Sequence, residues 1–222
     1  MSAAAIGAAE HMNRIYRTQR FIYDLTRRPY LLGRRALIDG LAPPPGGHVL
    51  EIGCGTAWNL IRAADRYPDA AFFGLDVSSA MLQTARRSIA RRRLGNRIVV
   101  AQADATGFDP LAMFGRPAFD RVFISYALSM IPDWRRAAAR AIDAVADEGS
   151  LHIVDFGQCE ALPRAFKAAL FAWLARFSVT PLADLELELG SLAKSRGLAA
   201  RICRPYGGYA VRAVLRSPED LS

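Results

Sequence analysis

Two glycines and two acidic residues are spaced as in a nucleotide-binding site. One acidic residue and both glycines lie within residues 49–55, and the second acidic residue follows the next apolar run. The run Val49–Ile52 contains Glu51 and leads into Gly53-Cys54-Gly55. Glycine lets the backbone turn sharply and lets a ligand approach without a Cβ in the way. Asp76 closes the next apolar run about 20 residues downstream, where a ribose-binding carboxylate is expected. The spacing predicts a nucleotide-type ligand at the carboxyl end of the first strand.

The segments that must position these residues alternate between strand and helix patterns. We expect strands at 48–52, 71–75, 98–102, 121–125 and 151–155, and helices at 58–67, at 134–145 and from Ser78 or Ser79 to Arg93, with a short turn or helical segment at 108–114. Two closing strands at 199–203 and 209–215 are expected to pair antiparallel. This pattern predicts an α/β fold: a doubly wound, Rossmann-like sheet of seven mostly parallel strands with helices on both faces.

The two ends of the chain differ from this alternating centre. Residues 9–37 have a basic, helical pattern with a break at Pro29, and a Pro/Gly-rich turn at 43–47 follows. We therefore expect an N-terminal basic helical arm or lid at 1–45 and one α/β domain at 46–217. Near the other end, 162–177 has the spacing of an amphipathic helix, and Thr180-Pro181 is expected to cap and start another.

Bulk properties exclude several classes of protein. The 222 residues, of which 52% are hydrophobic and 23% charged, are typical of one globular domain. The three cysteines are far apart, which argues against a disulfide framework or a metal site and favours a reducing compartment. We find neither a signal peptide nor a membrane-spanning run, so we expect a cytoplasmic protein. From the cysteine spacing we expect no bound metal. The net charge of +8 is compatible with nucleic acid or with an anionic membrane.

The details of the glycine turn favour one ligand over another. A nicotinamide site usually needs a third glycine at position 58, where this chain has Trp58. The series Glu51, Gly53, Gly55 and Ala57 instead resembles the first motif of S-adenosylmethionine-dependent methyltransferases. Further matches are Asp76, Asp104-Ala105 and Ser125-Tyr126. The resemblance implies S-adenosylmethionine as cofactor, held by Tyr23, Glu51, Gly53, Cys54, Gly55, Thr56, Asp76, Val77, Met81, Asp104, Ala105 and Ser125.

The arm narrows the choice of methyl acceptor. Tyr23-Asp24 resembles a pair found in methyltransferases whose arm folds over the cofactor. The longer string 13–34, together with 125–132 and Gly208-Tyr209-Ala210, resembles bacterial diacylglycerylhomoserine N-methyltransferases, although Phe21 and Pro29 depart from that pattern. The resemblance implies transfer to the amine of a membrane lipid headgroup, giving a trimethylated betaine lipid. The catalytic candidates are Tyr23, Tyr126 and Asp155; we expect His152 to be a packed residue instead.

The residues themselves agree with peripheral binding to a membrane and leave alternatives open. Seven arginines in the arm would be attracted to an anionic surface, at about 1 kcal/mol each, and the 162–177 helix could insert an apolar face. That helix could equally cover the core, Met81 could be plain core, and Asp76 could be only a helix cap. Other acceptors are phosphatidylethanolamine, another small molecule or a nucleic acid, although no base-flipping motif is present and we expect no nucleic-acid partner. A lipid-binding protein with an inactive cofactor site is the non-enzymatic alternative.

Overall fold

A computed structural model describes residues 31–221 of the chain. Tyr23 and most of the predicted arm lie outside these residues. The strands are β1 (His48–Ile52), β2 (Ala71–Asp76), β3 (Ile98–Gln102), β4 (Phe119–Ser125), β5 (Val145–Phe156), β6 (Ala199–Cys203) and β7 (Ala210–Arg216). The helices are α2 (Arg34–Asp39), α3 (Trp58–Arg66), α4 (Ser79–Arg91), α5 (Pro110–Phe114), α6 (Trp134–Asp143), α7 (Arg164–Ala175), α8 (Leu185–Ser195) and the short α9 (Pro205–Gly208).

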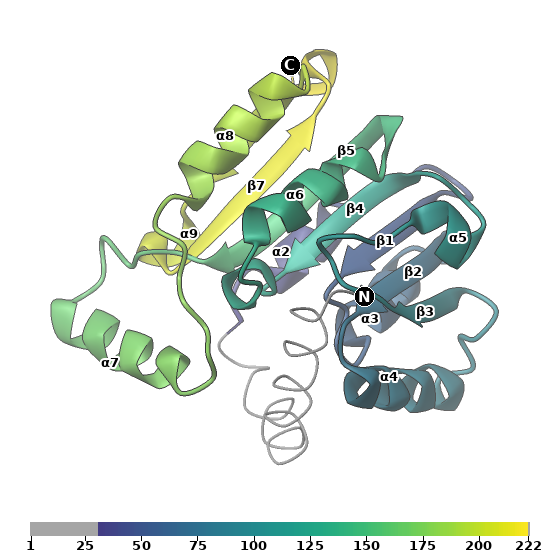
Figure 1. Cartoon of the computed structure of the whole chain (residues 1–222), viewed down its shortest axis with the longest axis horizontal. Helices are drawn as coiled ribbons and strands as arrows, with labels where there is room; N and C mark the ends of the chain where they lie inside the picture. Colours follow the sequence, from purple (N-terminus) through teal and green to yellow (C-terminus); the bar gives the residue numbers. More distant parts are fainter. Residues whose placement is uncertain (1–30, 222) are drawn as a thin grey trace.

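The seven strands form one sheet in the order β3-β2-β1-β4-β5-β7-β6 (Figure 1). The neighbours from β3 to β5 pair in parallel, whereas β7 runs antiparallel to both β5 and β6, so the sheet is mixed. One hydrophobic core packs α2, α3 and α4 against one face, and a second packs α5, α6 and α8 against the other. The seven-stranded α/β sheet with helices on both faces is confirmed, as is the antiparallel closing pair. The carboxyl ends of β1 and β4 meet at its centre, where such folds bind ligands.

Several expected boundaries are wrong. The expected helix at 134–145 ends at Asp143 because β5 already begins at Val145, which pairs with Phe119 of β4 before the register shifts. The expected helix start at Thr180-Pro181 is also wrong, since α8 begins at Leu185. The Thr180 amide donates to the carbonyl of Ser129, 3.1 Å away, which ties this segment to the loop after β4.

The described part of the predicted arm is short. Gly33 has φ +84°, a conformation that favours glycine, and the six-residue helix α2 starts directly after it. This break adds to the one expected at Pro29. Leu37 and Ile38 of α2 join the core beneath α3, so the end of the predicted arm packs on the sheet.

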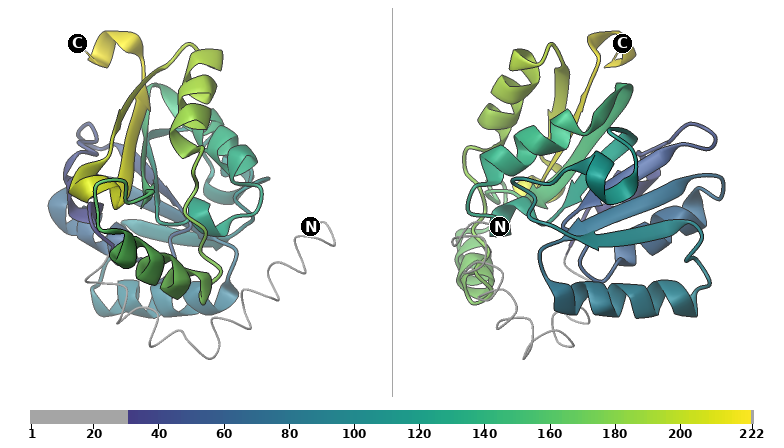
Figure 2. Two further views of the ribbon diagram at one scale, coloured as in Figure 1. Left: turned by 90° about the vertical axis from the view of Figure 1, so that its left-hand side faces the viewer. Right: turned by 45° about the vertical axis from the view of Figure 1, so that its right-hand side comes forward.

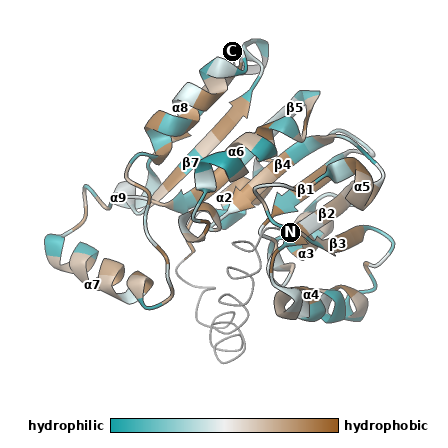
Figure 3. Cartoon of the chain, viewed as in Figure 1, coloured by the Kyte–Doolittle hydropathy of each residue, from teal (hydrophilic) through white to brown (hydrophobic). Residues whose placement is uncertain are grey.

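Helix α7 differs from the other long helices because it stands off the body of the sheet (Figures 1 and 2). Only Leu174 among its residues is buried, and Phe166 is 47% exposed although the helix is rich in apolar side chains (Figure 3). The expected amphipathic helix at 162–177 is therefore present at Arg164–Ala175. No helix within residues 31–221 is long and apolar enough to cross a membrane.

Candidate functional site

The glycine-rich turn after β1 is fixed by backbone hydrogen bonds to the neighbouring strand. The amides of Gly53 and Cys54 both donate to the carbonyl of Leu75, at 2.8 and 2.9 Å. The Gly55 amide donates to Oδ2 of Asp76 at 2.8 Å, and the Ser78 amide donates to Oδ1 of the same carboxylate at 2.8 Å. Asp76 thus joins the turn after β1 to the turn after β2.

The two glycines of the turn are needed for different reasons. Both have positive φ, +73° at Gly53 and +52° at Gly55. A Cβ on Gly53 would lie 2.6 Å from the Cβ of Ala127, in the loop after β4, whereas a Cβ on Gly55 would enter open space. Gly53 allows two loops to approach each other, and Gly55 leaves room for a ligand. Ala57 caps α3 in the same left-handed region, at φ +64°, which explains why a glycine is common at its place in the motif.

Glu51 is a buried carboxyl group beneath this turn. It is 1% exposed, and its Oε1 accepts a hydrogen bond from Nδ2 of Asn59 at 2.6 Å, while its Oε2 has no partner among the described residues. Burial raises the pKa of Glu51 to about 8, against the hydrogen bond from Asn59 and the positive charge of Arg34. The Arg34 guanidinium lies 4.2 Å above the ring of Trp58. The sequence motifs indicated neither the hydrogen bond from Asn59 nor the charge of Arg34.

Asp76 is more than a helix cap, because Ser78 performs that role for α4. The Ser78 hydroxyl accepts from the Met81 amide at 3.3 Å. Burial raises the pKa of Asp76, against the two amides that donate to it. The carbonyl of the next residue, Val77, accepts from Nε2 of Gln102 at 2.9 Å. Asp76 and Val77 are half-buried and lie at the end of β2, as expected of residues that face a ligand.

The remaining predicted cofactor residues lie after β3 and β4. Oδ1 of Asp104 accepts from both the amide and the hydroxyl of Thr106, each at 2.8 Å, and Ala105 is buried beside it. The hydroxyl of Ser125, at the end of β4, is buried with no partner among the described residues. Thr56 is half-buried in the glycine turn, and the Cys54 side chain packs on Gly74 in the interior, so Cys54 offers the site neither its thiol nor its amide.

The described catalytic candidates are buried and already engaged. The Tyr126 hydroxyl donates to the carbonyl of Leu32 at 2.5 Å, and burial raises the pKa of this phenol well above its usual range. The Asp155 carboxylate is fully buried and accepts from the amides of Ser129 and Phe156. His152 bonds Ser150 within the core, and burial lowers its pKa to about 3. This geometry makes Tyr126 and His152 poor proton acceptors and gives Asp155 a role in holding the loop after β4.

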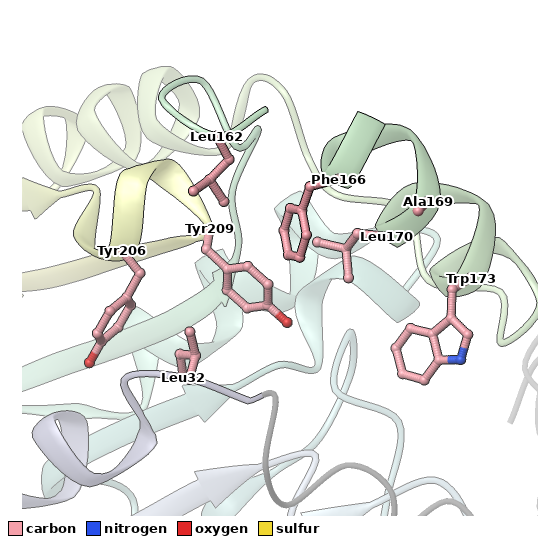
Figure 4. Close-up of a pocket in the computed structure, with 8 residues that line it drawn as sticks. All are labelled: Leu32, Leu162, Phe166, Ala169, Leu170, Trp173, Tyr206 and Tyr209. Atoms are coloured by element: carbon pink, nitrogen blue, oxygen red, sulfur yellow. The ribbon is translucent and has the colours of Figure 1, made fainter. Parts of the chain in front are cut away.

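An apolar pocket of about 580 Å³ lies beside the carboxyl end of β5 (Figure 4). Its walls come from α7, from the segment before α7, from α9 and the residue after it, and from the start of the described chain. The lining residues are Leu32, Leu162, Phe166, Ala169, Leu170, Trp173, Tyr206 and Tyr209. The Tyr209 ring contacts Phe156, which in turn contacts Tyr126 with ring centroids 4.6 Å apart. A continuous row of aromatic rings therefore connects the pocket to the end of β4. The sequence patterns did not indicate this pocket.

The base of the pocket is held by backbone hydrogen bonds between two distant segments. The amides of Gly157, Cys159 and Ala161 donate to the carbonyls of residues 209, 208 and 207, at 2.8 to 3.1 Å. Tyr206, Gly207 and Gly208 all have positive φ, which turns the chain tightly enough to make these contacts. The two segments consequently form one support for the start of α7.

Comparison with known proteins identifies the centre of the chain. A family model described as a methyltransferase domain matches residues 49–149, which contain the glycine turn, Asp76, Asp104 and Ser125. This part of the chain is similar to methyltransferase domains. Its cofactor is S-adenosylmethionine. The site fits that molecule, because the open space at Gly55 and the unpartnered buried oxygens of Glu51 and Ser125 lie at one end of the sheet. Within residues 31–221 there is no cluster of side chains that could hold a metal ion.

This chain matches only part of the length of its curated relatives. Aklanonic acid methyltransferase DauC of Streptomyces sp. (strain C5) is 32% identical over 145 residues, which are 64% of this chain and 59% of DauC. The ubiquinone/menaquinone biosynthesis C-methyltransferase UbiE of Paracoccus denitrificans is 28% identical over 125 residues, 56% of this chain and 48% of UbiE. The matched region thus spans about half the length of these relatives.

Solved structures match the fold over more of the chain. The DhpI–SAM–HEP complex has a TM-score of 0.66 at 20% identity and covers 97% of this chain and 99% of its own. A SAM-dependent methyltransferase from Aquifex aeolicus has a TM-score of 0.59 at 16% identity, with 85% and 91% of the two chains covered. These matches show that the chain has the class I methyltransferase fold.

Proposed function

We propose that this protein transfers methyl groups from S-adenosylmethionine to the amine of a membrane lipid headgroup. The observation that carries the proposal is the apolar, aromatic-lined pocket next to the cofactor end of the sheet. Its volume of about 580 Å³ falls within the range of small-molecule sites, and its lining suits the apolar body of an acceptor. The resemblance of the chain to diacylglycerylhomoserine N-methyltransferases makes that lipid the first acceptor to test.

The cofactor would bind over the ends of β1, β2 and β4. In this proposal the carboxylate of Asp76 accepts from the ribose hydroxyls, and that of Asp104 accepts from the adenine amine. The buried oxygens of Glu51 and Ser125 are available to the polar methionine end. When bound, S-adenosylmethionine supplies a methyl group that is already activated by its sulfonium charge.

The chain must then align the acceptor amine with that methyl group and exclude water, and most of the acceleration would come from this orientation. The aromatic row of Tyr209, Phe156 and Tyr126 leads from the pocket toward the site, and these buried rings give the pocket a rigid wall. The amine has to lose a proton before the transfer, and the solvent takes this proton because Tyr126, Asp155 and His152 are all buried. Tyr23 stays a catalytic prediction outside the described residues, and Tyr126 is assigned to holding Leu32 against the end of β4.

Helix α7 gives the proposal a route to the membrane. Its segment carries Arg164, Lys167 and Arg176 without an acidic residue between them, and several of its apolar side chains line the pocket. A basic helix with apolar residues at its surface is the kind of element that binds an anionic interface. An acceptor embedded in a bilayer could then enter the pocket from that surface.

A direct assay tests the proposal. Purified protein and methyl-labelled S-adenosylmethionine are mixed with vesicles that contain diacylglycerylhomoserine or phosphatidylethanolamine, and the labelled lipids are extracted. We expect label in diacylglycerylhomoserine. Label only in phosphatidylethanolamine would move the acceptor to that lipid, and no label in either would overturn the proposal. RNA in place of the vesicles serves as the nucleic-acid control and is expected to stay unlabelled.

A small aromatic molecule that is not part of a membrane is the second candidate acceptor. The names of DauC and UbiE refer to aklanonic acid and to ubiquinone/menaquinone biosynthesis. The same pocket could accept a planar apolar molecule of that kind through ring contacts with Phe166 and Tyr209. A quinol and a polyphenol added to the assay above distinguish this candidate, because they need no vesicle.

A further inference from the structure

The last residues of α7 and the turn after it contact the cofactor end of the site. Phe177 and Met130, the latter from the loop after β4, both pack against Met81 at the start of α4. These three side chains form a small hydrophobic cluster around Met81, and Met130 and Phe177 also pack against the core that contains α3 and α4. Met81 is 4% exposed within this cluster and follows Asp76 by five positions, where the adenine ring is expected to bind. Phe177 therefore lies behind the predicted adenine wall.

The same residue also contacts the acceptor pocket. The rings of Phe177 and Trp173 meet at an angle of 63°, with centroids 5.0 Å apart, and Trp173 lines the pocket (Figure 4). An edge-to-face pair of this kind prefers a defined geometry, so a displacement of one ring displaces the other. Met81, Phe177 and Trp173 form one line of packed side chains from the cofactor end to the pocket.

The backbone fixes this line where it leaves the helix. Leu174 is buried, and its carbonyl accepts from the amides of Phe177 and Val179 at 2.9 and 3.2 Å. Thr180 then donates to Ser129, which itself donates to Asp155 at 3.2 Å. The end of α7 is thus attached to the loop after β4.

We infer that Phe177 is a positioning residue that couples the two sites, so that bound cofactor strengthens acceptor binding and bound acceptor strengthens cofactor binding. Such coupling is reciprocal by thermodynamic necessity. The cofactor would press on Met81, and Phe177 would transmit that contact to Trp173 and the pocket wall. The inference rests on the acceptor pocket proposed above.

Calorimetry with two unreactive ligands tests the coupling without any turnover. S-adenosylhomocysteine, the demethylated product, represents the cofactor, and dodecylamine below its micelle concentration represents an apolar amine. The Kd of dodecylamine is measured with and without saturating S-adenosylhomocysteine. We expect roughly fivefold tighter binding of dodecylamine by the wild-type protein when the nucleoside is present, at the low end of typical couplings.

Three variants distinguish the role of Phe177 from a general loss of structure. Phe177→Ala should bind S-adenosylhomocysteine about fivefold more weakly and lose the coupling, as is common when a packed contact residue is truncated. Phe177→Leu keeps an apolar contact with Met81 but loses the ring contact with Trp173, so it should bind the nucleoside normally and couple weakly. Phe166→Ala is the matched control: it lines the pocket outside the cluster, so it should weaken dodecylamine binding alone.

The outcomes separate this inference from the proposed function. Full coupling in folded Phe177→Ala, or in Phe177→Leu should the alanine variant not fold, would overturn the inference. Wild-type protein that binds both ligands without coupling would also overturn it, while leaving the acceptor pocket intact. Failure of wild-type protein to bind dodecylamine would instead remove the acceptor pocket and the coupling with it.

Discussion

Gly53 and Gly55 stand two positions apart in one turn, and the structure predicts opposite consequences of adding a methyl group to them. At either position an alanine would adopt a left-handed conformation, at a cost of about 1–2 kcal/mol. Gly53→Ala would also collide with Ala127 and, as overpacking adds about 1–3 kcal/mol, should reduce the free energy of unfolding more. Gly55→Ala points into open space and should chiefly weaken cofactor binding.

Thermal unfolding and calorimetry with S-adenosylhomocysteine, applied to both variants, check this prediction. The informative quantity is the loss of stability relative to the loss of S-adenosylhomocysteine affinity in each variant. Equal losses of stability and of affinity in the two variants would show that the turn has no side open to the ligand.

Asp76 combines a structural and a binding role, and its substitution should reveal both. Asp76→Ala removes the acceptor for the Gly55 and Ser78 amides as well as the predicted ribose contact. Hydrogen bonds to a charged acceptor are worth about 1.5–3 kcal/mol, so the Kd for S-adenosylhomocysteine should rise at least tenfold. Asp76→Asn keeps an oxygen acceptor and should lie between. An unchanged Kd in the alanine variant would leave Asp76 with the structural role alone.

Glu51 should make stability depend on pH in a direction unusual for a carboxyl group. Its pKa in the folded protein is about 8, above the ordinary value of 4.5. Between these values the folded chain keeps a proton that the unfolded chain has lost, so stability falls as the pH rises from 5 to 8. The slope from one group is at most about 1.4 kcal/mol per pH unit. Glu51→Gln should flatten this part of the profile, as measured by urea unfolding; an unaltered slope would assign the titration to another group.

At the scale of elements, α7 is the surface on which membrane binding depends in the proposed function. Replacement of Arg164, Lys167 and Arg176 by glutamine should weaken binding to anionic vesicles, by up to about 1 kcal/mol per charge. Co-sedimentation with vesicles of phosphatidylglycerol measures this effect. Cofactor affinity should not change, because none of the three belongs to the hydrophobic cluster of Met81, Met130 and Phe177.

A matched variant on another helix controls for net charge. Arg86, Arg87 and Arg91 are exposed on α4, and their replacement by glutamine removes the same charge from a different surface. That variant should bind vesicles nearly as well as the wild-type protein. A similar loss in both variants would mean that overall charge, and not α7, attracts the membrane.

The elements that the sequence predicted well are those whose pattern is local. The strands β1, β2 and β4 are short, largely apolar runs, and Ser78 caps α4 as expected. The predicted start of α8 was wrong because Thr180-Pro181 has a good capping sequence. In the structure the Thr180 amide instead donates to the carbonyl of Ser129, about fifty residues away in the chain. A hydrogen bond over such a separation leaves no local pattern.

At the scale of the whole molecule, the sequence anticipated the cofactor end of the site better than the acceptor end. Glu51, Gly53, Gly55 and Asp76 belong to two consecutive βα turns, so their spacing alone indicated the site. The pocket instead combines Leu32, α7 and Tyr206–Tyr209, which meet only after the sheet has closed through β7. Phe177 had the spacing of a helix face, which cannot distinguish a core residue from a link between two sites.

The contact of Phe177 with both Met81 and Trp173 bears on how a trimethylated product would be made. The spent nucleoside must leave before each new donor molecule binds, and its departure would loosen the hold of Trp173 on the acceptor. Partly methylated lipid should then escape between rounds, so the enzyme would be distributive. Mass spectrometry of an early time course should find free mono- and dimethyl forms ahead of the trimethyl product. In the wild-type protein the amount of these intermediates should depend on the S-adenosylmethionine concentration, and in Phe177→Ala it should not.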